Sequence, residues 1–362
     1  MRPMTILRSD VPAFLATLAG SYRVFAPQRI GQSDVVFSEF QDGDPVELDF
    51  VNSVAPPKAL FFPARETLFH IEGARRPSLQ APPAGKPIAI FGMRSCDAAG
   101  TAFLDRFFAG RGFEDETVVS RIGSSLTMTL SCHTPGPDCF CVCCEGGPWL
   151  TSGFDIQFSD LGGRLLADVA TGKGEAAIAG APGLFKPAAA EDLEARARQV
   201  EQVDLLFSRR SYMAAGTKRV SLNQVPQGTW ERWAEDCQNC GGCCFVCPTC
   251  SCFTVADRAC AAPTARPVAG GEAHAASGGE SFDRERSWDA CLYGGFTREA
   301  SGHNPRAAKA ERLKRRFFHK MSYQYVELMG RHGCVGCGRC VATCMGGLDI
   351  SSLLERIHDE CP

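Results

Sequence analysis

Two short cysteine runs constrain this chain more than any other feature of its sequence. The first run comprises Cys237, Cys240, Cys243 and Cys247, and the second comprises Cys334, Cys337, Cys340 and Cys344. Both have the C-x2-C-x2-C-x3-C spacing that binds [4Fe–4S] clusters, and in two-cluster ferredoxins the fourth cysteine of each run binds the other cluster. Three thiolates spaced this closely reach three corners of one cubane, and the chain then carries its next cysteine to a neighbouring cubane.

The spacing therefore predicts two crossed ligand sets. We assign one cluster to Cys237, Cys240, Cys243 and Cys344, and the other to Cys334, Cys337, Cys340 and Cys247. Glycines at 241, 242, 336 and 338 let the backbone turn tightly around each cluster. A pair of structural zinc sites is the alternative, since zinc also binds four thiolates. Zinc ribbons usually show two separated C-x2-C pairs, so two complete runs favour iron. Met345 departs from the pattern, because a proline usually follows the fourth cysteine.

Length and composition indicate a globular protein with two domains. The chain has 362 residues, of which 44% are hydrophobic and 22% charged. A net charge of -3 gives no reason to expect a nucleic-acid or membrane partner. Residues 1–20 predict an amphipathic first helix, whose apolar stretch at 11–20 is too short to span a bilayer. Twenty cysteines, clustered as thiolate ligands, require a reducing compartment, so we expect a cytoplasmic protein.

The predicted fold class is α+β, with a mixed α/β domain at residues 1–186. Apolar and alternating patterns predict its strands, and an apolar-periodic segment predicts a helix at 98–109. The strands are expected at 35–40, 59–62, 86–91, 126–130, 155–158 and 165–169. The strand at 86–91 delivers the segment Met93-Arg-Ser-Cys96-Asp97 to a strand end, where α/β sheets commonly place ligand-binding loops.

A second group of cysteines follows these strands. Cys96 and Cys132 each come just after a predicted strand, and Cys139 and Cys141 lie in a Pro/Gly-rich loop. Four thiols converging on one rim of the sheet could hold a third [4Fe–4S] cluster. Buried free thiols are the alternative, because unpaired cysteine is among the most commonly buried side chains.

The remaining sequence predicts a helical connector at 187–228 and a helical ferredoxin-like domain at 229–362, with a flexible insertion around 261–280. Trp230 and Trp233 lie three apart on a helix face and are expected to shield a cluster from water. Cys250 and Cys252 are interpreted as packing beside the clusters, with ligation left open. A basic helix at 306–320 is either a solvated face or a source of cations facing the clusters, which would raise their potentials.

Motifs for substrate chemistry are absent from the sequence. It contains no Gly-x-Gly-x-x-Gly after a strand, no phosphate loop and no His-Glu-x-x-His pair. We therefore expect no catalytic residue in this chain and no site for flavin, nicotinamide or a nickel–iron centre. The sequence indicates a protein that moves electrons.

The constellation as a whole resembles the iron–sulfur beta subunit of cytoplasmic, NADP-linked nickel–iron (sulf)hydrogenases. The anaerobic sulfite reductase A subunit is a relative with the same plan. The segments that carry the resemblance are Pro57-Lys-Ala-Leu-Phe-Phe-Pro63 with Glu66, Gly92-Met-Arg-Ser-Cys96-Asp97, Cys132, Cys139-Phe-Cys141, Gly153-Phe-Asp155, Trp230, residues 237–252, Trp288-Asp-Ala-Cys291, Gly302-His-Asn-Pro-Arg306, Phe318-His-Lys320 and residues 334–340.

The resemblance implies an electron-relay subunit of a hetero-oligomeric oxidoreductase. Its implied partners are a subunit that binds flavin and NAD(P) and the small and large subunits of a nickel–iron hydrogenase. The family's own cysteine positions also coincide with Cys96, Cys132, Cys139 and Cys141, which favours a third cluster there. Cys143, Cys144, Cys244 and Cys260 fall where other residues are expected and are left out.

Three functional hypotheses follow. The first is an electron-transfer subunit of a hydrogenase complex, and the second attaches the same relay to an anaerobic sulfite or sulfur reductase. The third is a zinc-stabilised scaffold that binds nucleic acid through its basic helix, which the near-neutral net charge disfavours.

The first hypothesis predicts iron and acid-labile sulfide in the isolated chain, and no hydrogen uptake without partner subunits. Metal and sulfide analysis of anaerobically purified protein checks this expectation. Zinc in place of iron would contradict it.

Overall fold

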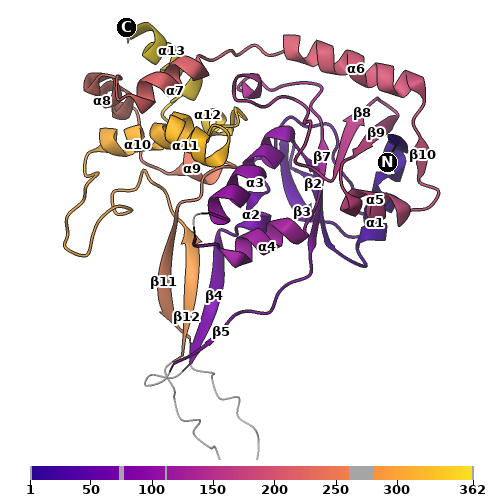
Figure 1. The fold of residues 1–362 in the computed structure, drawn as a ribbon, viewed down its shortest axis with the longest axis horizontal. Coiled ribbons are helices and arrows are strands. Elements are labelled where there is room, and N and C mark those ends of the chain that lie inside the picture. The colour runs from indigo at the N-terminus through magenta and orange to yellow at the C-terminus, as the bar shows by residue number, and fades with distance from the viewer. Residues whose placement is uncertain (1, 73–76, 111, 261–280, 361–362) are drawn as a thin grey trace, which may run out of the picture.

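The chain has α+β architecture, as its sequence predicts. The computed structural model describes residues 2–72, 77–110, 112–260 and 281–360 (Figure 1). A mixed sheet flanked by helices forms the N-terminal half, and an assembly of helices forms most of the C-terminal half. The flexible insertion predicted around 261–280 lies outside the described residues.

Eight strands form the larger sheet, in the order β10-β1-β9-β8-β7-β6-β2-β3. Their bounds are β1 (Met4–Leu7), β2 (Arg23–Ile30), β3 (Asp34–Glu39), β6 (Ile88–Met93), β7 (Leu126–Leu130), β8 (Ile156–Asp160), β9 (Arg164–Val169) and β10 (Phe185–Pro187). The central strands β2, β6, β7 and β8 are parallel, and the outer pairs are antiparallel. The carboxyl ends of β6 and β7 therefore meet at one edge of the sheet, where Cys96 and Cys132 follow them.

Helices cover both faces of this sheet. Helices α1 (Val11–Leu18) and α5 (Gly172–Ala179) lie on one face, and α2 (Lys58–Phe61), α3 (Ser95–Phe108) and α4 (Glu116–Ser124) lie on the other. The fully buried strand β6 serves both cores, because side chains alternate along a strand. Phe91 packs toward α1, and Ile90 packs toward α2 and α3.

Two local predictions for the N-terminal half are wrong in instructive ways. The predicted first helix begins only at Val11, after strand β1 and the 3-10 turn η1 (Arg8–Asp10), because residues 4–7 pair with both β9 and β10. The strand predicted at 59–62 is helix α2, which follows Pro57 and buries Phe61 and Phe62. A short apolar run does not distinguish a buried strand from one buried helical turn.

The C-terminal helices enclose a second core. They are α6 (Ala190–Leu205), α7 (Met213–Ser221), α8 (Gln227–Glu235), α9 (Gly242–Phe245), α10 (Lys309–Met321), α11 (Tyr323–Met329), α12 (Arg339–Ala342) and α13 (Ile350–Glu360). Trp230 from α8 packs on Phe317 from α10, with ring centroids 5.8 Å apart, and Leu354 from α13 joins the same core. Across the described part of the chain, no helix is both long and apolar enough to cross a bilayer.

A second, four-stranded sheet joins the two halves of the chain. Its order is β11-β12-β4-β5, with bounds β4 (Arg65–Glu72), β5 (Ser78–Gln80), β11 (Phe253–Ala259) and β12 (Ser281–Trp288). In Figure 1 it projects away from both cores. Arg286 at its base is 1% exposed and forms ion pairs with both Glu66 and Asp115. The buried guanidinium therefore ties β12 to β4 and to the N-terminal half.

Replacing Arg286 by methionine should loosen this sheet. Removing one member of a buried ionic group costs about 3–5 kcal/mol; here Asp115 loses its cation and Glu66 keeps only Arg121. We expect faster hydrogen exchange of the β4 and β12 amides in R286M, measured by mass spectrometry. The matched control is R284M, since Arg284 on the same strand pairs with Asp257 at the surface. Equal protection in the two variants would contradict the assignment.

Candidate iron–sulfur centres

The first predicted ligand set gathers around one cavity. Cys237, Cys240 and Cys243 from the first run line it together with Cys344, the last cysteine of the second run. The first run turns around this cavity at Gly241, whose φ of +74° starts helix α9. From the second run, Cys344 Sγ accepts a hydrogen bond from the backbone N–H of Leu348 at 3.3 Å. The two runs therefore meet crosswise here.

The second predicted set lines an adjacent cavity. Cys334, Cys337 and Cys340 from the second run share it with Cys247 from the first. Its walls include Arg316 and Lys320 from α10. Cys340 also borders the first cavity, so the two ligand sets are direct neighbours.

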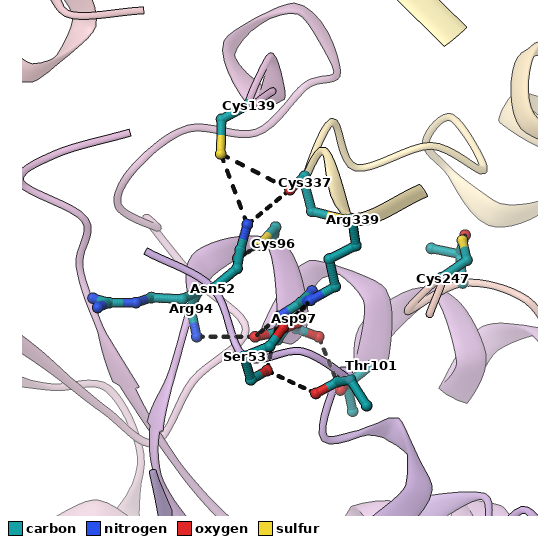
Figure 2. A network of polar contacts seen from close by, with 12 residues as sticks. Asn52, Ser53, Arg94, Cys96, Asp97, Thr101, Cys139, Cys247, Cys337 and Arg339 are labelled. Carbon is teal, nitrogen blue, oxygen red and sulfur yellow. Dashed lines mark hydrogen bonds and ion pairs between the residues drawn. The ribbon is translucent and has the colours of Figure 1, made fainter. Parts of the chain in front are cut away.

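The third predicted set lies at the edge of the large sheet. Cys96 stands in the first turn of α3, after β6, and Cys132 follows β7. Cys139 and Cys141 come from the loop around the 3-10 turn η2 (Cys141–Cys143), and both are close enough to Cys132 to feel its charge. Asn52 contacts two members, because its Nδ2 is 3.8 Å from Cys139 Sγ and its Oδ1 is 3.7 Å from Cys96 Sγ (Figure 2).

The third and second sets are in contact through the close approach of two loops. Gly336 and Gly338 lie in the second run, both at positive φ. A Cβ on Gly336 would lie 2.5 Å from backbone atoms of Cys141, and one on Gly338 would lie 2.6 Å from the Asp138 carbonyl oxygen. Only glycine combines this backbone conformation with this approach. The close packing also places Cys337 against Cys96.

A buried ion pair fixes the same junction. Arg339, in the second run, pairs with Asp97 of α3 through contacts of 2.7 Å and 3.1 Å (Figure 2). The Arg339 guanidinium also donates to the backbone carbonyl and hydroxyl oxygens of Ser53. Asp97 is 1% exposed and Arg339 is 4% exposed, so loss of either partner would leave an uncompensated charge in the interior.

Helix α10 presents buried cations to the thiols, which agrees with one of the alternatives for the basic segment at 306–320. The Arg316 guanidinium lies 3.7 Å from both Cys244 Sγ and Cys250 Sγ. Lys320 donates to Thr249 Oγ1 at 2.7 Å, beside Cys247. Burial would lower the pKa of Lys320, but the thiolate charges of Cys247 and Cys250 raise it above its ordinary value. The described residues offer neither cation a carboxylate partner.

Burial disfavours the thiolate form of several of these cysteines. Burial raises the pKa of Cys337 and of Cys139 to about 11. Coordination to a metal deprotonates a thiol outright, and the resulting thiolates then compensate the cations of α10. Thiolate donors beside buried positive charge fit an iron–sulfur cluster, whose core and thiolates together are negative. The described residues place no three ligand side chains at the spacing of a single metal ion.

Several residues that contact these sites were not predicted. Cys144 is fully buried, and its thiol beside Cys334 lowers the pKa of the Cys334 thiol. Lys58 is 3% exposed and lies over the Trp288 indole, 4.2 Å from the ring centroid. Lys58 lies in one of the segments that carry the family resemblance, but the local sequence gives neither residue a role, because each reaches the site through long-range packing.

Two comparisons with known proteins support this description. The family model for the 4Fe-4S dicluster domain matches residues 236–348. Sulfhydrogenase 2 subunit beta of Pyrococcus furiosus is 27% identical over 360 residues, which is 99% of each chain. The resemblance noted in the sequence is thereby confirmed, and it extends across nearly the whole chain.

Replacing Gly336 by alanine should disturb the junction between the second and third ligand sets. The matched control is G347A, because Gly347 has a φ of +65° with open space around it. Both variants carry the strain of the left-handed region, roughly 1–2 kcal/mol. Only G336A also forces the Cys141 backbone away, so we expect it to lose iron from the purified protein while G347A keeps it. Equal iron contents in the two variants would contradict the packing argument.

Proposed function

We propose that this chain is an iron–sulfur electron-transfer subunit of a hetero-oligomeric oxidoreductase. In that complex it relays electrons between a subunit that binds flavin and NAD(P)H and a nickel–iron hydrogenase module. Similarity over 99% of the chain to a sulfhydrogenase beta subunit supports this role. The hydrogenase module is inferred from the relative's name, and the electron relay is inferred from the chemistry of the ligand sets.

The crosswise gathering of cysteines is the observation that carries the proposal. Each of two adjacent cavities is lined by three cysteines of one run and by the fourth cysteine of the other. Two-cluster ferredoxins distribute their ligands in this way. We therefore propose [4Fe–4S] clusters on both sets, and a third on Cys96, Cys132, Cys139 and Cys141. A bound iron–sulfur cluster accepts and releases single electrons.

The ligand sets form a continuous series, which a relay requires. Cys337 of the second set packs against Cys96 of the third. Cys340 lines both the first and second cavities, and Arg316 borders both as well. No set is therefore separated from the next by a layer of unrelated protein. The protein's contribution is to hold the sets at this spacing and to surround them with buried cations, which favour the reduced state.

The two ends of the series reach the surface at different places. In the first set Cys240 is exposed, and the neighbouring Met345 is 79% exposed. At the opposite end, a cavity of about 670 Å³ is lined by Cys139 together with Asn52 and Arg339. These two openings are where we propose that electron-donating and electron-accepting partner subunits dock.

Purification of the native complex tests the choice of partners. We expect a nickel-binding large subunit and a flavin subunit to co-purify with this chain. A sirohaem subunit in their place would instead assign the relay to the sulfite or sulfur reductase alternative. A strongly salt-dependent shift of DNA or RNA would support the nucleic-acid scaffold.

Four single alanine variants test the crossed ligation, with EPR-monitored redox titration and iron analysis as readouts. We expect C247A and C337A to lose the same cluster signal, and C344A and C240A to lose the other. Each variant should lose roughly four iron atoms per chain. If C247A instead removed the signal lost in C240A, each run would hold its own cluster. The crossed arrangement would then be wrong.

A further inference from the structure

Four cysteines outside the three ligand sets converge where helix α9 meets the base of the β11–β12 hairpin. They are Cys244, Cys250, Cys252 and Cys291. Cys244 Sγ and Cys291 Sγ are 4.0 Å apart. Cys252 and Cys291 line the same cavity, and the Arg316 guanidinium contacts the sulfurs of both Cys244 and Cys250. The four thiols thus form one connected group.

The register of the hairpin produces this convergence. Phe253 at the start of β11 pairs with Trp288 at the end of β12. Cys252 directly precedes Phe253, and Cys291 lies three residues after Trp288. The backbone N–H of Asp289 donates to the Cys252 carbonyl at 3.0 Å, which continues the pairing past the strand ends. Antiparallel pairing therefore brings together cysteines that lie far apart in sequence.

Three buried cations surround the group. Arg316 contacts the sulfurs of Cys244 and Cys250, and Lys58 Nζ donates to the backbone carbonyls of the same two residues at 3.4 Å and 3.0 Å. Lys320 lines the adjoining cavity. Within the described chain, no ion pair with a carboxylate is formed by any of the three. Buried charges require compensation, which neutral thiols would not provide. Arg316 and Lys320 also line the cavities of the crossed sets, whereas Lys58 borders neither of those cavities.

A cavity of about 300 Å³ adjoins the thiols. Cys250, Cys252 and Cys291 line it, together with His319 from α10. The Nε2 atom of His319 is buried, and among the described residues it has no hydrogen-bond partner. An N–H at this position would find its acceptor in a sulfur atom of a group held in the cavity. Space, ligands, positive charge and an unpartnered polar atom thus coincide at one place.

We propose that Cys244, Cys250, Cys252 and Cys291 bind a further [4Fe–4S] cluster. This site is additional to the crossed ligand sets of the dicluster domain and to the set at the sheet edge. It adjoins both members of the dicluster pair, because Cys244 directly follows Cys243 and because the backbone N–H of Cys250 donates to the Cys247 carbonyl at 3.4 Å. The site goes beyond the proposed function, and its chemistry does not depend on the identity of any partner subunit.

Iron and sulfide analysis of the reconstituted full chain tests this site. We expect roughly sixteen iron atoms per chain in the wild type, and roughly twelve in C252A and in C291A. The matched control is C260A, since Cys260 lies at the outer end of the same hairpin, and it should keep the wild-type content. EPR signals of the other clusters should persist in all three variants.

Iron contents equal to wild type in both C252A and C291A would overturn the proposal, as would zinc bound in place of iron. Failure of the proposed function would give a different pattern. The crossed sets would then hold no iron, and C252A and C291A would lose the iron that the wild type still binds. Alkylation of the wild-type protein supplies a test that does not depend on variant folding. Cys250, Cys252 and Cys260 are all partly buried; the first two should react only after iron is chelated, whereas Cys260 should react at once. Immediate reaction of all three would overturn the proposal.

Discussion

The arrangement depends on positive charge buried among thiols. Helix α10 places Arg316 and Lys320 in the interior, at 6% and 5% exposure, and Lys58 joins them from α2 at 3%. Burying an unpaired ammonium or guanidinium group costs several kcal/mol even after relaxation of the surroundings. The neighbouring groups that can carry negative charge are cysteines, and they would do so as metal-bound thiolates. The basic helix and the cysteine runs are therefore two halves of one structure, and neither is stable in this position without the other.

Folding of the two halves of the chain is coupled through the same region. Glycines of the second cysteine run pack onto the loop that carries Cys139 and Cys141, and the Asp97–Arg339 pair closes the junction. The smaller sheet adds a second connection, because strands from residues 65–80 pair with strands from residues 253–288. Loss of metal from one set should thus weaken the packing of the next, since each set shares walls with its neighbour.

Much of this fold could be predicted from the sequence. Strand β6 and helix α3 follow from the apolar pattern of their residues, and a helix is expected over most of α10. The spacing of the two runs is the basis of the crossed ligand sets that we propose. The register of β11 and β12 could not be predicted, because β12 also pairs with β4, more than two hundred residues earlier. For that reason the sequence does not show that Cys291 lies beside Cys252. Lys58 and Cys144 were missed for the same physical reason, since only tertiary packing brings them to the thiols.

Anomalous scattering at the iron edge, from crystals of the anaerobically purified chain, tests the central claim most directly. The account predicts one iron-rich peak bounded by Cys237, Cys240, Cys243 and Cys344, and a second bounded by Cys334, Cys337, Cys340 and Cys247. Peaks that left both Cys247 and Cys344 far from any iron would contradict it. Scattering at the zinc edge in place of iron would contradict it equally.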